Sequence, residues 1–240
     1  MKSGEQTPSI YKYFEERSHM EEFLQDGLVY FNSLSYFLSC EDPSRKDSEE
    51  DTYVYRPNVG LRVHNLTTKK EFILFDMQIN SKVTNPHQIF IFCASIKLNK
   101  VLYEKFKSKG CVEIFRSDVF KERIQSQIDI LYGQKILGCN QLLSGPVDYY
   151  SCNDEPGVRH ALPEKIIMQK SADKYGEEGE YRFALAEDCN AFAVNNVKYF
   201  LSTKSVSTST PPNHKILRLG PLLDICRVAE PPDIRAETSP

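Results

Sequence analysis

The sequence of 240 residues has no long apolar run, no strong net charge and no tryptophan. A membrane-spanning helix needs roughly 18 or more consecutive apolar residues, and no stretch approaches that length. The opening segment MKSGEQTPSIYKYF lacks the apolar core of a secretory signal, which predicts a cytoplasmic protein. The formal charge of −3 argues against a general electrostatic attraction to nucleic acid or anionic membranes, although a local basic patch remains open.

Paired cysteines and clustered metal ligands are also absent. The seven cysteines include no CxxC pair, and most lie among apolar or aromatic residues, as in IFIFCASI. This pattern is typical of reduced, buried thiols in a cytosolic protein. The five histidines form neither HExxH nor a Cys/His knuckle, so no metal site is expected. The lack of GxxxxGK(S/T), GxGxxG and GxSxG removes P-loop NTPases, Rossmann enzymes and α/β-hydrolases as default interpretations.

The remaining composition is that of an ordinary globular protein, with 40% hydrophobic and 26% charged residues. Helices are predicted over 17–27, between a serine capping box and a final glycine, and over 118–133, between a capping Asp118 and a terminating Gly133. The run 88–96 is apolar on both faces and predicts a central strand. Further strands are predicted over 10–14, 28–32, 59–65, 71–79, 145–150, 164–171, 179–186, 191–196, 197–202 and 215–220. We therefore expect one predominantly β, α+β domain over residues 1–229, followed by a flexible tail over 230–240.

The segment DKYGEEGEYRFALAE, residues 173–187, concentrates charge just before an apolar strand. Most acidic clusters of this kind are only solvated turns. Strand alternation, however, places Tyr181 and Phe183 on one face and Glu180 with Arg182 on the other. A carboxylate beside a guanidinium stays ionised and oriented, so it can accept a hydrogen bond from a sugar hydroxyl or stabilise a developing cation.

A second candidate site lies in the aromatic-rich strands near the N-terminus. Lys12 lies between Tyr11 and Tyr13, and Asn32, Ser33 and Ser35 are predicted on the loop that follows the second strand. Tyr and Phe commonly pack in cores. A cation, an amide and hydroxyls beside aromatic faces also suit a planar ring next to ribose or phosphate.

The segment 39–53, SCEDPSRKDSEEDTY, is predicted to be a mobile, solvated surface loop. Cys40 could act as a nucleophile, but no histidine lies near it in the sequence. The carboxylates of the loop lack EF-hand spacing and a glycine, so a solvated loop is favoured over a Ca²⁺ or Mg²⁺ site.

The order of these motifs resembles that of a large family of bacterial domains of unknown function. The matching elements are YKY, GLVYFNSLSYF followed by EDP, IFCAS and KSADKYGEEGEYRF, and EGEYR is the most specific. The resemblance covers residues 10 to about 186. Typical members carry tryptophan where this chain has Tyr175 and Tyr181, and Phe-Asn where it has Cys40 and Glu41. That family is similar in layout to the ADP-ribosyltransferase fold, which implies split, mixed or antiparallel β-sheets with peripheral helices.

The resemblance also implies a chemistry. NAD⁺ is cleaved at the bond between nicotinamide and ribose through an oxocarbenium-like transition state, which a carboxylate stabilises. This role falls to Glu180. Glu178 would orient or deprotonate the nucleophile of the acceptor.

The same resemblance implies which residues bind NAD. Lys12 or Tyr13 would hold phosphate or ribose, and Ser33 would support Glu180 or the ribose. Tyr36 would stack on nicotinamide. The remaining residues of the implied binding site are Tyr11, Asn32 and Arg182, of which Arg182 anchors the strand or pairs with a carboxylate.

We therefore expect an NAD-dependent ADP-ribosyltransferase that uses NAD as substrate, needs no metal and modifies an intracellular macromolecule, either protein or nucleic acid (RNA or DNA). Small enzymes of this kind often resemble toxin or phage-defence effectors, so a neutralising antitoxin is an expected partner, whereas a membrane is not. Two alternatives remain open: a non-catalytic module that binds a nucleotide or a protein, and an NAD glycohydrolase that transfers to water. Because the position is placed at a strand edge, Glu180→Gln is expected to leave stability nearly unchanged.

Overall fold

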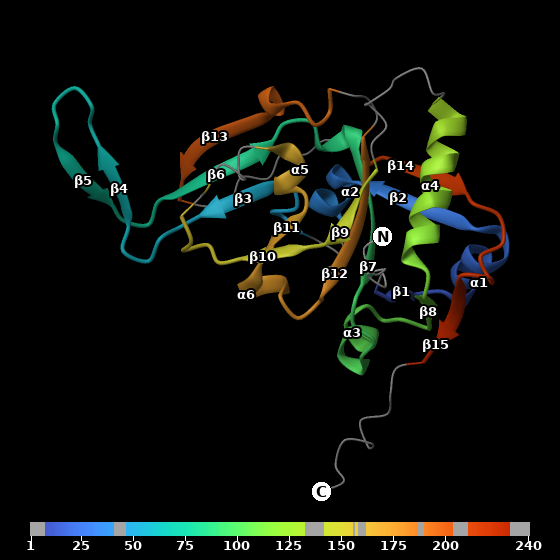
Figure 1. The fold of residues 1–240 in the computed structure, drawn as a ribbon. Helices are drawn as coiled ribbons and strands as arrows, with labels where there is room; N and C mark the ends of the chain where they lie inside the picture. Colours follow the sequence, from blue (N-terminus) through green and yellow to red (C-terminus); the bar gives the residue numbers. More distant parts are fainter. Residues whose placement is uncertain are drawn as a thin grey trace, which may run out of the picture.

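The centre of the molecule is an eight-stranded antiparallel sheet (Figure 1). The computed structural model describes residues 8–40, 47–132, 142–155, 157, 162–186, 190–203 and 211–230. The expected tail beyond residue 230 and positions 41–46 of the acidic loop lie outside these ranges. The strands of the sheet are β1 (Ile10–Phe14), β2 (Leu28–Ser33), β7 (Ile89–Ser95), β8 (Gly110–Ile114), β9 (Leu143–Pro146), β12 (Glu180–Ala186), β14 (His214–Arg218) and β15 (Cys226–Ala229).

Smaller sheets and short helices surround this sheet, which confirms the α+β class. Three antiparallel strands form a second sheet: β13 (Val197–Ser202), β6 (Gln78–Val83) and β3 (Thr52–Tyr55). The strands β10 (Asp148–Tyr150) and β11 (Gln169–Ser171) form a parallel pair, and β4 (Leu61–His64) with β5 (Glu71–Leu74) forms a hairpin. The helices are α1 (Arg17–Asp26), α2 (Leu34–Ser39), α3 (Lys100–Lys105), α4 (Ser117–Tyr132), α5 (Pro163–Ile166) and α6 (Ala172–Tyr175), with 3-10 turns η1 (Pro86–Gln88) and η3 (Val194–Asn196).

The large sheet divides along one edge of its central strand, β7. On one side β7 pairs with β12 over its whole length. On the other side β2 pairs with residues 90 and 91, whereas β1 pairs only with Ser95. Within the described chain no strand pairs with residues 92–94 on that side. The strands β1 and β2 therefore diverge from β7 and leave an open stretch of its edge between them.

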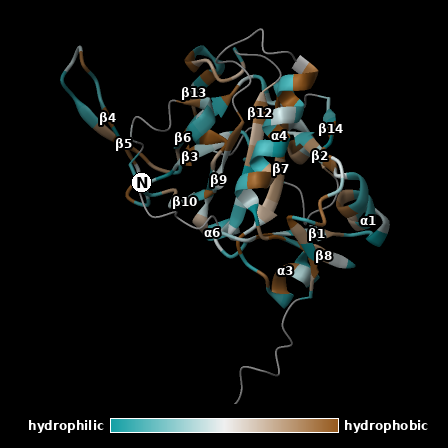
Figure 2. Ribbon diagram, turned by 45° about the vertical axis from the view of Figure 1, so that its right-hand side comes forward, coloured by the Kyte–Doolittle hydropathy of each residue, from teal (hydrophilic) through white to brown (hydrophobic). Residues whose placement is uncertain are grey.

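The main core lies between the large sheet and the helices α1 and α4. Four phenylalanines meet there: Phe23 of α1, Phe92 of β7, Phe120 of α4 and Phe183 of β12. Their ring centroids lie 5.4 to 6.1 Å apart for the Phe23–Phe92, Phe92–Phe120 and Phe120–Phe183 pairs. In Figure 2, α4 carries hydrophobic and hydrophilic bands in alternation, as expected for a helix with one buried face. Aromatic packing thus fixes the position of β7 and β12.

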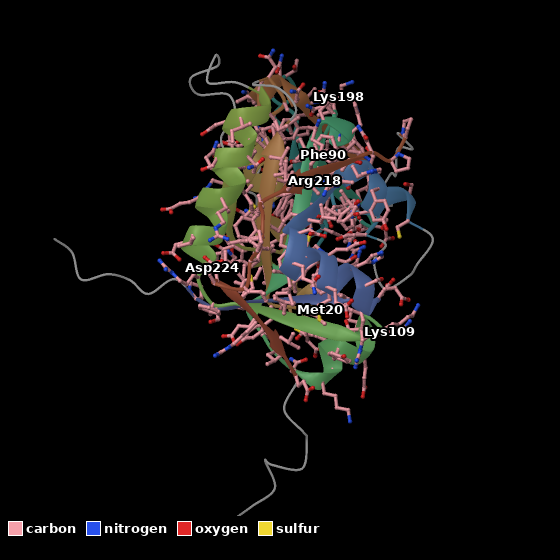
Figure 3. All side chains as sticks on the ribbon, turned by 90° about the vertical axis from the view of Figure 1, so that its right-hand side faces the viewer. Met20, Phe90, Lys109, Lys198, Arg218 and Asp224 are labelled. Carbon is pink, nitrogen blue, oxygen red and sulfur yellow. The ribbon has the colours of Figure 1, made fainter. Side chains whose placement is uncertain are left out.

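Close contacts also hold α1 and α4 against the strands that follow them. A Cβ atom added to Gly110 of β8 would lie 2.5 Å from the sulfur of Met20, so a larger residue there would require the Met20 side chain to move. Figure 3 shows Met20 and Lys109 at this junction and Asp224 on the side of α4. The guanidinium of Arg123 forms an ion pair with Asp224, just before β15.

Several sequence predictions are confirmed. The expected helix 17–27 is α1, and Gly27 ends it in the left-handed conformation with φ of 64°. The run 88–96 contains the central strand β7. The predicted serine capping box is wrong, because Glu16 precedes the helix and makes no side-chain capping hydrogen bond.

Some strand boundaries differ from the prediction. The expected strand 71–79 is divided into β5 and β6, since the chain turns at Asp76, where φ is 59°. Residues 164–171 form α5 and then β11, because Pro163 suits the first turn of a helix. Residues 191–196 form turns and η3 instead of a strand. The strand predicted as the last one, β14, is followed by β15.

Two segments predicted as loops differ from that prediction in the residues that the structure describes. Asn32 and Ser33 end β2, and Ser35 lies in α2. The acidic segment 39–53 was expected to be solvated, but residues 50–53 at its end are buried. The segment therefore supplies buried carboxylates to the interior of the protein.

Candidate functional site

A cavity of about 510 Å³ lies where β1 and β2 diverge from β7. Five consecutive residues of β7, Ile91–Ser95, line it, which places it along the open edge of that strand. Residues 11–14 of β1 and Leu28, Tyr30 and Asn32 of β2 line it from either side. Its volume falls within the range of pockets that enclose small organic ligands.

One end of the cavity carries four carboxylates. Glu180 begins β12 and Glu178 lies in the turn just before it, whereas Asp47 and Glu50 come from the acidic segment before β3. All four side chains are buried. The structure therefore brings together the two glutamates predicted from the sequence and adds two carboxylates that the sequence analysis placed in solvent.

Arg182 holds two of these carboxylates from within the protein. It is fully buried, its Nε lies 2.7 Å from Oε1 of Glu180, and its Nη2 lies 3.2 Å from Oε2. The same Nη2 lies 2.5 Å from Oε1 of Glu50, and Nη1 donates to the carbonyl oxygen of Ile167. The predicted pairing of Glu180 with Arg182 on one face of the strand is thus confirmed. Arg182 itself is absent from the lining of the cavity, so it anchors the strand and does not face a ligand.

Lys170 of β11 is the second cation of this cluster; its side chain is 11% exposed and lines the cavity. Its ammonium nitrogen lies 3.0 Å from Glu180 Oε2, 3.4 Å from Asp47, 3.5 Å from Glu50 and 3.7 Å from Glu178. One cation thus contacts all four carboxylates and neutralises part of their mutual repulsion.

These neighbours move the proton affinities of the carboxylates in opposite directions. Burial raises the pKa of Glu50 to about 8, because Arg182 and Lys170 offset only part of its desolvation. Burial also acts to raise the pKa of Glu180, but Arg182 and Lys170 together outweigh it and hold that pKa well below its usual range. Near neutral pH Glu180 is therefore ionised, while Glu50 carries a proton in a large fraction of molecules.

Glu178 has different surroundings, although it lies only two residues away. Lys105 of α3 approaches Oε1 at 2.8 Å, and the hydroxyl of Ser95 donates to the backbone oxygen of Glu178 at 2.6 Å. Gly179, with φ of 54°, turns the chain between the two glutamates. Its left-handed backbone lets two successive carboxylates reach one cavity from a turn and a strand.

Lys12 lies on the other wall of the cavity, at the divergence of the sheet. Its Nζ donates to the carbonyl oxygen of Cys93 at 2.7 Å and lies 4.6 Å from the centre of the Phe92 ring. These contacts place a cation on the open edge of β7, beside a carbonyl group that receives no β-ladder bond there. A cation at this point suits the anionic part of a ligand.

The hydroxyl of Tyr13 is engaged within the protein. It donates to the carbonyl oxygen of Lys97 at 2.9 Å and accepts from the backbone N–H of Asn99 at 3.2 Å. Burial raises the pKa of Tyr13 to about 12. Tyr13 therefore contributes its ring to the cavity wall and remains neutral at physiological pH.

The other predicted binding residues divide into two groups. Tyr11, Asn32 and Tyr36 line the cavity. Ser33 does not, because it is fully buried and its hydroxyl accepts a hydrogen bond from the backbone N–H of Asn213 at 3.0 Å. It pairs with one end of β7 and Glu180 with the other, roughly 17 Å away at about 3.4 Å per residue. Ser33 therefore does not support Glu180.

The sequence analysis missed Asp47, Glu50 and Lys170. A run of acidic residues in a turn-rich segment looks solvated, and no local pattern pairs it with a lysine far along the chain. One signal was available: Lys170 comes two residues after the apolar run Ile166–Met168, and burial of that run brings Lys170 toward the interior.

No group of histidine, cysteine, aspartate or glutamate side chains that could hold a metal ion occurs within the described ranges. No helix in the same part of the chain is both long and apolar enough to cross a membrane. Comparison of the chain with models of protein families, with curated proteins and with solved structures found no match.

Proposed function

We propose that this protein is an NAD-dependent ADP-ribosyltransferase that modifies an intracellular macromolecule, either a protein or a nucleic acid. One observation carries the proposal. Glu178 and Glu180 of the EGEYR segment lie together on the wall of a cavity of about 510 Å³ that also contains Tyr11, Lys12 and Tyr36. A carboxylate pair, a cation and aromatic rings around one cavity are the groups that a dinucleotide with a cleavable ribosyl bond requires.

In the proposed reaction, the bond between C1 of the ribose and the nicotinamide nitrogen breaks, and its electron pair leaves with nicotinamide. The sugar develops positive charge, which the fixed negative charge of Glu180 stabilises. The nucleophile of the acceptor then bonds to C1, and Glu178 takes its proton. Lys12 binds the diphosphate, while the rings of Tyr11 and Tyr36 contact the planar groups.

Glu178 has more capacity to contact a ligand than Glu180 has. A carboxylate offers about four acceptor positions. Those of Glu180 receive Nε and Nη2 of Arg182 and the ammonium of Lys170. Glu178 has one close partner, Lys105 at 2.8 Å, and a distant one in Lys170 at 3.7 Å. We therefore assign the direct contact with the acceptor to Glu178 and the role of an oriented charge to Glu180.

The test uses NAD⁺ labelled on its adenylate group, incubated with the purified protein and a cell lysate. Glu178→Gln is the principal variant, and Glu177→Gln is its matched control, since Glu177 is an exposed neighbour that does not line the cavity. Wild type and the control are expected to label a macromolecule, and Glu178→Gln to do so at least about 100-fold more slowly. Protease or nuclease treatment of the labelled product then identifies the class of acceptor. Equal labelling by all three proteins would overturn the assignment of Glu178.

A second function is favoured because Arg182 and Lys170 occupy most of the hydrogen-bond acceptor positions of the Glu180 carboxylate. A module that binds a nucleotide without turnover needs a rigid, internally paired network, and Arg182 and Lys170 supply one. This alternative predicts nucleotide binding by wild type with neither label transfer nor nicotinamide release. Nicotinamide release without a labelled macromolecule would instead identify an NAD glycohydrolase.

A further inference from the structure

The hairpin of β4 and β5 forms an arm that extends away from the rest of the molecule (Figure 1). Four consecutive apolar residues, Phe72–Phe75, lie along its second strand and the turn that follows. Phe72, Ile73 and Phe75 are exposed to 47%, 48% and 70%. An isolated two-stranded hairpin is only marginally stable in water, and a contiguous apolar stretch on its outer strand is an interaction surface.

The edge of β5 that faces away from β4 carries backbone groups that can pair with another strand. Lys70, Phe72 and Leu74 face Asn65, Val63 and Leu61 across the hairpin, and the backbone N–H of Asn65 donates to the oxygen of Lys70 at 2.9 Å. Antiparallel pairing alternates, so this bond directs the N–H and C=O groups of residues 70, 72 and 74 toward β4. Those of residues 71 and 73, the other two residues of the strand, therefore point outward. In the described chain β5 has no strand partner on that side.

We propose that β5 pairs with β5 of a second copy of this chain, in antiparallel register about a two-fold axis at Ile73. The sequence of the strand, Lys70-Glu71-Phe72-Ile73-Leu74-Phe75-Asp76, is self-complementary in that register. Ile73 faces its own counterpart, Phe72 faces Leu74 of the other copy, and Lys70 reaches the end of the partner strand, where Asp76 lies. The product is a continuous four-stranded sheet with an isologous interface.

The charged residues distinguish this register from the two in which the two-fold axis lies one residue earlier or later. Shifting the axis to Phe72 places Lys70 against Leu74, and shifting it to Leu74 places Glu71 against Met77. The axis at Ile73 sets Glu71 opposite Phe75 but brings each Lys70 to Asp76 of the other copy, so the attraction between Lys70 and Asp76 distinguishes this register from the other two. Opposite charges across strands stabilise pairing, whereas a charge against an apolar side chain gives no such gain.

The interface is small, since it involves one strand and its side chains from each copy. Interfaces well below about 1,000 Å² are weak and reversible, so a dissociation constant in the micromolar range or above is expected. None of residues 70–76 lines the cavity, and the pairing does not depend on the proposed function.

Sedimentation equilibrium of the full chain, over concentrations on the order of 1 to 500 µM, tests this proposal. Wild type is expected to shift from monomer to dimer across this range. Ile73→Lys places two ammonium groups face to face on the axis and is expected to remain monomeric. Because Ile73 is exposed in the single chain, circular dichroism and melting temperature should match those of wild type. A wild type that remains monomeric throughout, or a dimer that survives Ile73→Lys, overturns the proposal.

A charge exchange tests the register. Lys70→Glu is expected to raise the dissociation constant roughly tenfold, since it turns two attractions into repulsions, and Lys70→Glu with Asp76→Lys is expected to restore it. The matched control is Lys69→Glu, an equally charged and exposed neighbour in the turn of the hairpin with φ of 58°, outside the paired strand. Equal weakening by Lys69→Glu and Lys70→Glu would overturn the register, because it would mean that only net charge matters.

Discussion

Glu180 and Arg182 lie two residues apart on β12 and form a two-point ion pair inside the protein, with N–O distances of 2.7 and 3.2 Å. β12 lies between β7 and β9, so Glu180 is not at a sheet edge as the sequence suggested. The pair is therefore part of the interior, and changes to either residue act on stability as well as on the cavity.

Glu180→Gln is expected to destabilise the protein, contrary to the expectation from the sequence. The amide leaves the Arg182 charge with a weaker partner, and breaking a buried ion pair costs about 3–5 kcal/mol. The free energy of unfolding in urea measures this change. Glu177→Gln, an exposed change of the same chemistry, should stay within about 0.5 kcal/mol of wild type. A loss below about 1 kcal/mol for Glu180→Gln would show that solvent reaches the pair.

Stability is expected to fall between about pH 4.5 and pH 8 because of Glu50. Its folded pKa of about 8 lies above the usual value of 4.5, so the folded protein binds the proton that the unfolded chain has released. The contribution of this group is therefore most favourable below pH 4.5 and is lost as pH rises, with a slope of at most about 1.4 kcal/mol per pH unit. Glu50→Gln should remove this part of the slope. Parallel curves for wild type and variant would show that the carboxyl group is ionised in the folded protein.

Lys170→Met is expected to destabilise the protein by about 3–5 kcal/mol at pH 7, because it leaves buried carboxylates without a shared cation. The loss should decrease as the pH is lowered toward 5, since the carboxylates of the variant bind protons more readily. Thermal unfolding at several pH values measures this trend. A loss independent of pH would mean that Lys170 contributes mainly through packing.

Gly179→Ala is expected to cost about 1–2 kcal/mol, because the residue is left-handed with φ of 54°. The new Cβ would also lie 3.0 Å from side-chain carbons of Lys97. Gly157→Ala is the matched control, since nothing lies within 4 Å of a Cβ added there. If the turn sets the position of Glu178, Gly179→Ala should also slow label transfer at temperatures where the variant is fully folded, whereas Gly157→Ala should not.

The sequence was sufficient for features that follow from local alternation. It correctly placed Tyr181 and Phe183 on the face of β12 opposite to Glu180 and Arg182, because a strand has a period of two and the core selects one face. The aromatic strand 10–14 was also recognised, and its residues line the cavity.

The sequence was insufficient where burial depends on a distant partner. The residues next to Asp47 and Glu50 in the sequence are typical of a solvated loop. The ion pairs with Lys170 offset the free-energy cost of burying these two carboxylates. Ser33 was assigned to the site because it follows an aromatic strand, but the sheet register carries it to the other end of β7. Register depends on how strands pair in the assembled sheet, so it cannot be predicted from the sequence of one strand.

The arrangement around β7 also governs how the protein forms during synthesis. Its three partner strands come from the beginning of the chain, β1 and β2, and from residues 180–186, which the ribosome adds much later. Until then the apolar strand β7 has one edge without its partner, a state that invites aggregation or binding by a chaperone. The cavity also lacks Glu178 and Glu180 until that point. A nascent chain, or a product truncated before β12, therefore has no complete site, and any activity arises only in the finished protein.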